Sequence, residues 1–153
     1  MATDQGSQAV ELVRRLFKEV FEAGKLEAAD DILTPDFTFQ YPFPGFSPGA
    51  EGIKEFVKVF HDAFPSFELE VHDLFGTADA VAIRWTLRGQ HKGALLGVPA
   101  SGKYVTLSAI GVYHPHHGKG RLKAGWLELD TLGLLQQIGA VEPTNKLLPG
   151  LRK

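Results

Sequence analysis

The chain has 153 residues, of which 44% are hydrophobic and 22% are charged. This length suits one domain with its own core, and the composition is typical of a globular protein rather than a disordered or membrane-spanning one. The formal net charge of −2 gives no field that would attract nucleic acid or an anionic membrane, so we expect neither as a partner. The absence of cysteine excludes disulfides, zinc–thiolate sites and thiol nucleophiles.

The sequence predicts a single domain over residues 1–153, with its core over about 8–140 and a loosely held tail over 141–153. The first residues have neither the basic nor the apolar segment of a secretory leader, and no run of about 18 apolar residues occurs. We therefore expect a cytoplasmic protein.

The first part of the chain is predicted to be mainly helical. Apolar residues recur at helical spacing over 8–23, and Gly24 follows as a stop signal. A short helix is expected over 26–33 and a longer one over 52–64. Between them, residues 37–41 alternate like a short strand.

After Pro65 the hydrophobic period changes to two, which is typical of strands. A glycine-rich loop interrupts this part, and a short helix is expected over 131–138. The strands are predicted at 67–75, 80–90, 103–114 and 122–129. This order predicts an α+β fold in which N-terminal helices pack on a strongly curved antiparallel sheet and leave a cone-shaped pocket for a small molecule.

Asp130 is the first candidate for chemistry. Alternation along the last strand places it on one face with Trp126 and Glu128. A carboxylate beside a tryptophan in an apolar cavity suits general acid–base catalysis, because burial disfavours its charged form. The alternative is an N-cap, since Asp130 comes directly before a predicted helix. Glu128 either forms a carboxylate pair with Asp130 or is solvated near the strand end.

Histidines give two further hypotheses. His91 ends the second long strand and either donates a proton to a bound carbonyl compound or is an ordinary loop histidine. His114, His116 and His117 flank a glycine-containing turn with no carboxylate nearby in sequence to complete a metal site. We therefore expect a solvated turn there and no bound metal.

Arg84 is the only charged residue within 81–85, and it either faces the wetter side of the sheet or is buried with an acidic partner. Aromatic residues are abundant, and most are expected in the core. The side chains predicted to line a substrate pocket are Trp126, Glu128, Trp85, Phe39, Tyr41, Phe60 and Phe17.

Several short motifs occur in a fixed order along the chain. They are Ala-Phe-Pro at 63–65, Gly-Gln-His-Lys-Gly at 89–93, Leu-Gly-Val-Pro-Ala-Ser-Gly-Lys at 96–103, Trp-Leu-Glu-Leu-Asp at 126–130 and Leu-Leu-Gln-Gln-Ile-Gly at 134–139. Together they resemble the SnoaL-like polyketide cyclases, within the superfamily whose fold is named after nuclear transport factor 2. The resemblance extends over about 10–139.

The resemblance implies a curved sheet wrapped by helices, an assembly into dimers or tetramers, and an aldol-type ring closure without metal or cofactor. In that family an aspartate in the Trp-x-x-x-Asp segment is the acid–base group, and it falls on Asp130 here. The base removes a proton alpha to a carbonyl while the pocket stabilises the enolate. Ser66 and Ala124 stand where the family often has Asp and Glu, which leaves the substrate open.

These residues are compatible with three functions. The first is a cyclase or isomerase of a hydrophobic carbonyl compound, with Asp130 as acid–base group and His91 as orienting group or proton donor. The second is an epoxide hydrolase, against which Thr86 stands where an aspartate would follow Arg84. The third is a non-catalytic small-molecule binding domain. An interior filled by the protein's own aromatic rings, or an Asp130 bound to backbone N–H groups, would favour the third.

Overall fold

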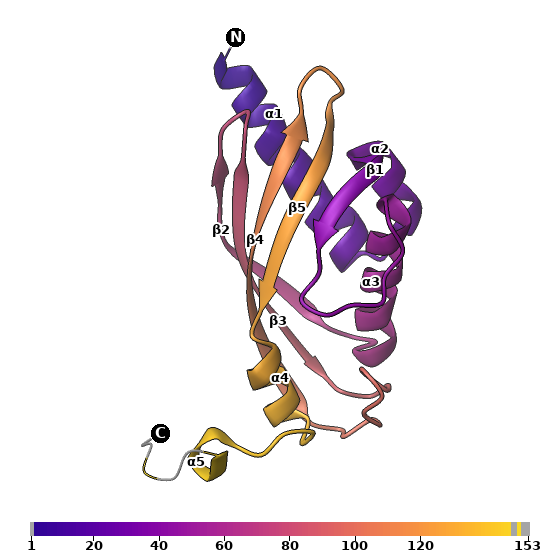
Figure 1. The fold of residues 1–153 in the computed structure, drawn as a ribbon, viewed down its shortest axis with the longest axis vertical. Helices are drawn as coiled ribbons and strands as arrows, with labels where there is room; N and C mark the ends of the chain where they lie inside the picture. The colour runs from indigo at the N-terminus through magenta and orange to yellow at the C-terminus, as the bar shows by residue number, and fades with distance from the viewer. Residues whose placement is uncertain (1, 148–149, 151–153) are drawn as a thin grey trace.

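Helices come first along the chain and the long strands follow, as predicted (Figure 1). The computed structural model describes residues 2–147 and 150. The first helix, α1 (Ala2–Arg15), begins six residues before the predicted start at residue 8. Its first residues are polar, so they carry no hydrophobic period. α1 continues as a π-helix, η1 (Leu16–Glu22), and Gly24 ends it with a φ of 70°.

Most of the remaining elements are close to their predicted ranges, but the first strand begins at Leu33 rather than at residue 37, and the helix over 144–147 was not predicted. In chain order the remaining elements are η2 (Leu26–Ala28), α2 (Ala29–Ile32), β1 (Leu33–Gln40), α3 (Ala50–Ala63), β2 (Glu68–Gly76), β3 (Val81–Gln90), β4 (Tyr104–His116), β5 (Arg121–Leu129), α4 (Thr131–Gln137) and α5 (Thr144–Leu147). Of the predicted tail, residues 148–149 and 151–153 lie outside the described part of the chain. No helix within the described residues is both long and apolar enough to cross a membrane.

The five strands form one sheet in the order β1-β5-β4-β3-β2. β2 to β5 are antiparallel neighbours, as predicted, but β1 pairs with β5 in parallel, so the expectation of an antiparallel sheet is wrong for β1. Nothing in the short β1 pattern shows its direction, because β1 is joined to β5 only through α3 and three strands. The sheet curves around the helices without closing into a barrel (Figure 1).

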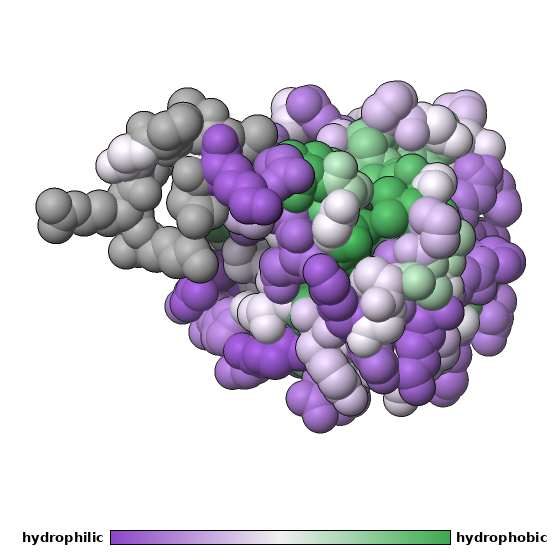
Figure 2. All heavy atoms as spheres, turned by 90° about the horizontal axis from the view of Figure 1, so that it is seen from below, coloured by the Kyte–Doolittle hydropathy of each residue, from purple (hydrophilic) through white to green (hydrophobic). Residues whose placement is uncertain are grey.

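Alternation along the strands separates a buried inner face from an exposed outer face. On β4, the residues from Val105 to Tyr113 in steps of two are buried, and those between are exposed or partly exposed. The helices α1 and α3 lie against the inner face (Figure 1). Seen from the end where α4 lies, hydrophobic side chains reach the surface near the middle of the molecule (Figure 2). The apolar interior is therefore incompletely covered at this end.

A bulge changes the face of β5. The register of β4 and β5 shifts between His114 and Pro115, so Leu122 is buried but the next buried positions are Gly125 and Leu127. Strict alternation from Leu122 therefore assigns Trp126 and Glu128 to the inner face, whereas both are exposed on the outer face. Trp126 is 49% exposed on the outer face, and the prediction that it points inward is wrong.

Candidate functional site

An aromatic cluster fills the space between the inner face of the sheet and the helices. The ring of Phe17, in the π-helix, lies 5.6 Å from Trp85 on β3 and 6.0 Å from Tyr113 on β4, measured between centroids. Phe39 on β1 lies 5.9 Å from Tyr113 and 4.8 Å from Tyr41. The structure thus brings together four residues of the predicted pocket and adds Tyr113. π-helical segments are rare and often occur at functional sites.

Phe60, also predicted to line the pocket, belongs to a continuation of this cluster. It lies 5.0 Å from Phe56, which in turn lies 5.5 Å from Tyr41. Gly125 on β5 allows the rings to approach the sheet, since an added Cβ would lie 2.8 Å from Tyr113 and 2.9 Å from Phe39. A bare backbone position is therefore part of the packing here.

Three hydrogen-bond donors in this cluster are unpaired. Tyr41 Oη, Trp85 Nε1 and Tyr113 Oη are buried and have no hydrogen-bond partner among the described residues. Burial raises the pKa of Tyr113, and the neighbouring Tyr41 adds to this effect. Burial, followed by the charge of Glu55, raises the pKa of Tyr41. Both phenols therefore stay protonated at neutral pH. Buried donors without partners are costly, and such groups in a native fold often mark a ligand or water site.

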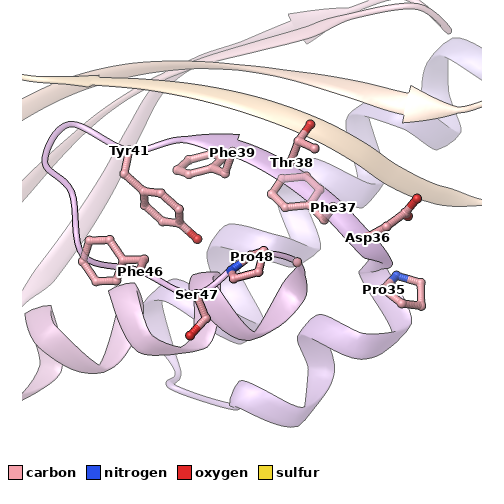
Figure 3. Close-up of a pocket in the computed structure, with 10 residues that line it drawn as sticks. Pro35, Asp36, Phe37, Thr38, Phe39, Tyr41, Phe46, Ser47 and Pro48 are labelled. Atoms are coloured by element: carbon pink, nitrogen blue, oxygen red, sulfur yellow. The ribbon is translucent and has the colours of Figure 1, made fainter.

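A pocket of about 590 Å³ opens beside Tyr41 (Figure 3). On one side are Phe37 and Phe39 of β1, and on the other is the chain segment that follows β1. The Tyr41 hydroxyl is directed into the space between them, and Asp36 and Thr38, whose side chains project from the other side of β1, also line the pocket (Figure 3). The pocket therefore has aromatic walls and a phenol at its inner side.

Asp130 lies outside the aromatic cluster. Its side chain is the N-cap of α4, with Oδ1 accepting the backbone N–H of Gly133 at 2.9 Å, and the residue is exposed. A Cβ at Gly133 would lie 2.1 Å from Asp130 Oδ2, so this cap fits closely over a glycine. The N-cap alternative is what the structure shows, and the expected placement of Asp130, Glu128 and Trp126 in an apolar cavity is wrong. An acid–base role for Asp130 stays a prediction.

His91 is fully buried at the end of β3. Its Nδ1 accepts the backbone N–H of Ser101 at 3.1 Å and lies 2.9 Å from Ser101 Oγ. Because Nδ1 is an acceptor, Nε2 carries the proton of the neutral ring. Nε2 is buried and has no partner in the described chain, and the ring lies 5.8 Å from Phe64. His91 thus resembles the tyrosines in being an unpaired donor.

The other candidate residues lie away from this interior. Arg84 faces the outer side of the sheet and pairs with Asp73 at 2.6 Å, so the first of its two alternatives is correct. His114 and His117 contact Asp79 beside the turn. No group of three or more metal-binding side chains that could hold an ion occurs within residues 2–147 and 150.

Comparison with known proteins places the chain in a family. The family model described as SnoaL-like polyketide cyclase matches residues 11–138. The chain belongs to this family. No protein of curated function matches it.

Solved structures with SnoaL-like folds cover most of the chain. A candidate SnoaL-like polyketide cyclase from Jannaschia sp. CCS1 has 27% identity and a TM-score of 0.79, over 90% of this chain and 95% of that one. A candidate polyketide cyclase from Acidithiobacillus ferrooxidans has 32% identity and a TM-score of 0.72, over 86% and 94%. IdmH from Streptomyces antibioticus, another candidate polyketide cyclase, has 26% identity and a TM-score of 0.70, over 86% and 99%.

Sequence reasoning missed Tyr113. Alternation along 103–114 could have placed it on the inner face with Leu107 and Ala109, because all three share the same parity. The missing partners of the buried donors, in contrast, become visible only in three dimensions.

Proposed function

We propose that this SnoaL-like protein is a cyclase or isomerase that acts, without a cofactor, on a hydrophobic polyketide-like carbonyl compound. The observation that carries the proposal is the set of unpaired donors, Tyr41 Oη, Trp85 Nε1 and Tyr113 Oη, within one aromatic interior. Family membership and the fold agree with it. The cytoplasmic location and the assembly into dimers or tetramers stay predictions.

The chemistry follows from what such donors do to a carbonyl. Loss of a proton alpha to the carbonyl leaves an enolate whose negative charge is on oxygen. Neutral hydroxyl and indole N–H donors stabilise this charge more than they stabilise the neutral ketone, so they lower the barrier to its formation. The raised pKa values of Tyr41 and Tyr113 favour this role, because a phenol that stays protonated remains a donor.

Proton removal is assigned to Asp130, in line with the family resemblance. This role requires the Asp130 carboxylate to reach a ligand in the interior. Leu129 pairs with Ala109, and Ala109 pairs with Trp85, so Asp130 lies one residue beyond the row of the sheet that carries Trp85. To act on a ligand in the interior, its carboxylate has to leave the N–H of Gly133. His91, with Nε2–H as an unpaired donor, is proposed as an orienting group or proton donor.

The experiment is turnover of a panel of linear poly-β-keto methyl esters, followed by liquid chromatography and mass spectrometry for cyclised isomers or their dehydrated forms. The variant Tyr113→Phe is expected to lower the rate about 100-fold, the effect of removing one preorganised donor. Tyr104→Phe is the matched control, because Tyr104 is 79% exposed on the outer face. Equal rates for the two variants would contradict the assigned donor role.

A second candidate function is binding without catalysis. It is favoured by two observations: aromatic rings occupy the interior, and Asp130 is engaged as a helix cap. Binding of a ketone without turnover of any compound in the panel, by a correctly folded wild type, would support this candidate.

A further inference from the structure

The segment 42–49, between β1 and α3, contacts the rest of the protein in an unusual way. Within the described chain, residues 42–48 take part in no backbone–backbone hydrogen bond. The segment is instead held by aromatic packing: Phe46 lies 4.6 Å from Tyr41 and 5.4 Å from Phe56, and Phe43 lies 5.8 Å from Phe56. Contacts of this kind can be broken without dismantling a sheet or helix.

One side chain fixes this segment to α3. The carboxylate of Glu55 accepts the backbone N–H of Ser47 at 3.0 Å and the Ser47 hydroxyl at 2.5 Å. These two bonds lower the pKa of Glu55, so the group is a carboxylate at neutral pH. Ser47 also lines the pocket beside Tyr41. The contact with Glu55 therefore fixes one wall of that pocket.

Glycines permit both the close approach and the turns of the segment. A Cβ at Gly52 would lie 2.1 Å from the Ser47 carbonyl oxygen and 2.5 Å from Tyr41 Oη, so the segment and the phenol meet on a bare patch of α3. Gly45 and Gly49 have φ values of 114° and 75°, which few other residues adopt. Two such positions give the segment places at which it can turn.

We propose that residues 42–49 form a lid over the pocket, that Glu55 holds the lid closed through Ser47, and that a flat aromatic or conjugated ketone enters when this contact breaks. The ligand would lie between the β1 rings Phe37 and Phe39 and the lid, with its carbonyl oxygen towards the Tyr41 hydroxyl (Figure 3). The identity of the ligand rests on the proposed function, whereas the movement of the lid does not.

The loop over 91–103 is less able to act in this way. At its base the N–H of His91 donates to the Lys103 carbonyl and the N–H of Gly102 donates to the His91 carbonyl. At its tip Leu95 and Val98 exchange a pair of hydrogen bonds. His91 also anchors Ser101 from inside the fold. The opening of this loop would break several hydrogen bonds at once. Movement of residues 42–48 breaks the two hydrogen bonds at Glu55 and the ring contacts of Phe43 and Phe46.

The lid is tested first without a ligand, by amide hydrogen exchange in Glu55→Ala. We expect the Ser47 amide, whose N–H donates to Glu55 in wild type, to exchange about tenfold faster, since one hydrogen bond to a charged group is worth roughly that factor. Glu51→Ala is the control, because Glu51 is also on α3 but pairs with Lys54. Unchanged exchange in the lid of Glu55→Ala would overturn the proposal.

The second readout is the binding of 2-acetylnaphthalene, followed by stopped-flow tryptophan fluorescence. Association and dissociation rates are both expected to rise about tenfold in Glu55→Ala and to stay unchanged in Glu51→Ala. Rates that are equal in all three proteins would show that the ligand does not pass the lid. Faster exchange in the lid, with no ketone binding even in wild type, would keep the lid but contradict the proposed ligand.

Discussion

The cap at the start of α4 gives the sharpest prediction about Asp130. Replacement of Asp130 with alanine removes the acceptor of the Gly133 N–H, and loss of an N-cap costs about 1 kcal/mol in the free energy of unfolding. For a chain of this size that corresponds to a decrease of about 2–4 °C in melting temperature. Asp130→Asn should be nearly neutral, because asparagine caps helices equally well.

A double-mutant cycle that combines Asp130→Ala with Gly133→Ala tests the same contact. In a helix, Gly→Ala normally stabilises by about 0.5–1 kcal/mol. In this protein the added Cβ would collide with Asp130 Oδ2, so Gly133→Ala is expected to destabilise the wild type. In the Asp130→Ala background the collision is absent, and the same change should become neutral or stabilising. The coupling between the two sites is expected to be about 1–2 kcal/mol.

Urea denaturation gives the free energies, and exchange of the Gly133 amide by NMR reports the capping bond itself. Glu128→Ala is the matched control, because Glu128 is an exposed carboxylate two residues earlier. Equal stability of Asp130→Ala and wild type, or a cost of Gly133→Ala that does not depend on residue 130, would refute the reasoning. Loss of stability in Asp130→Asn as large as in Asp130→Ala would refute it as well.

Two further predictions concern the interior. Burial raises the pKa values of Tyr41 and Tyr113, so the folded protein retains protons that the unfolded chain releases above about pH 10. The free energy of unfolding should therefore fall as the pH rises above that value. In an absorbance titration these two phenols are expected to ionise only when the protein unfolds. Ionisation of either phenol before unfolding would contradict their burial. Gly125→Ala should cost about 1–3 kcal/mol in urea denaturation, since its Cβ would collide with two rings, and an unchanged midpoint would contradict this packing.

Hydrophobic periodicity was sufficient to predict most elements. It located α3 and the four antiparallel strands to within a few residues, because each has a buried and an exposed face. It could not predict that β1 is parallel, since the partner and the direction of a short edge strand depend on the path of the whole chain. It also missed the bulge at His114, which is a feature of pairing and not of one strand.

The site was harder to predict than the fold. The single missed bulge placed Trp126 and Glu128 on the wrong face. At Asp130 the local pattern of an aspartate before a helix predicted the observed contact, whereas the family resemblance favoured a place inside a pocket. Phe17, Phe39, Tyr41 and Trp85 lie together because buried aromatic residues on facing elements meet in one core, and their role as the lining of a substrate pocket stays a prediction.

The buried donors are proposed to recognise a carbonyl oxygen. The most direct test compares the affinities of 2-acetylnaphthalene and 2-ethylnaphthalene, which have similar shapes but differ in the carbonyl, for wild type and Tyr113→Phe. We predict that wild type prefers the ketone and that Tyr113→Phe loses about 2- to 12-fold of this preference, the contribution of one neutral hydrogen bond. Equal affinity of wild type for the two compounds, or a preference that Tyr113→Phe leaves unchanged, would contradict recognition of a carbonyl by these donors.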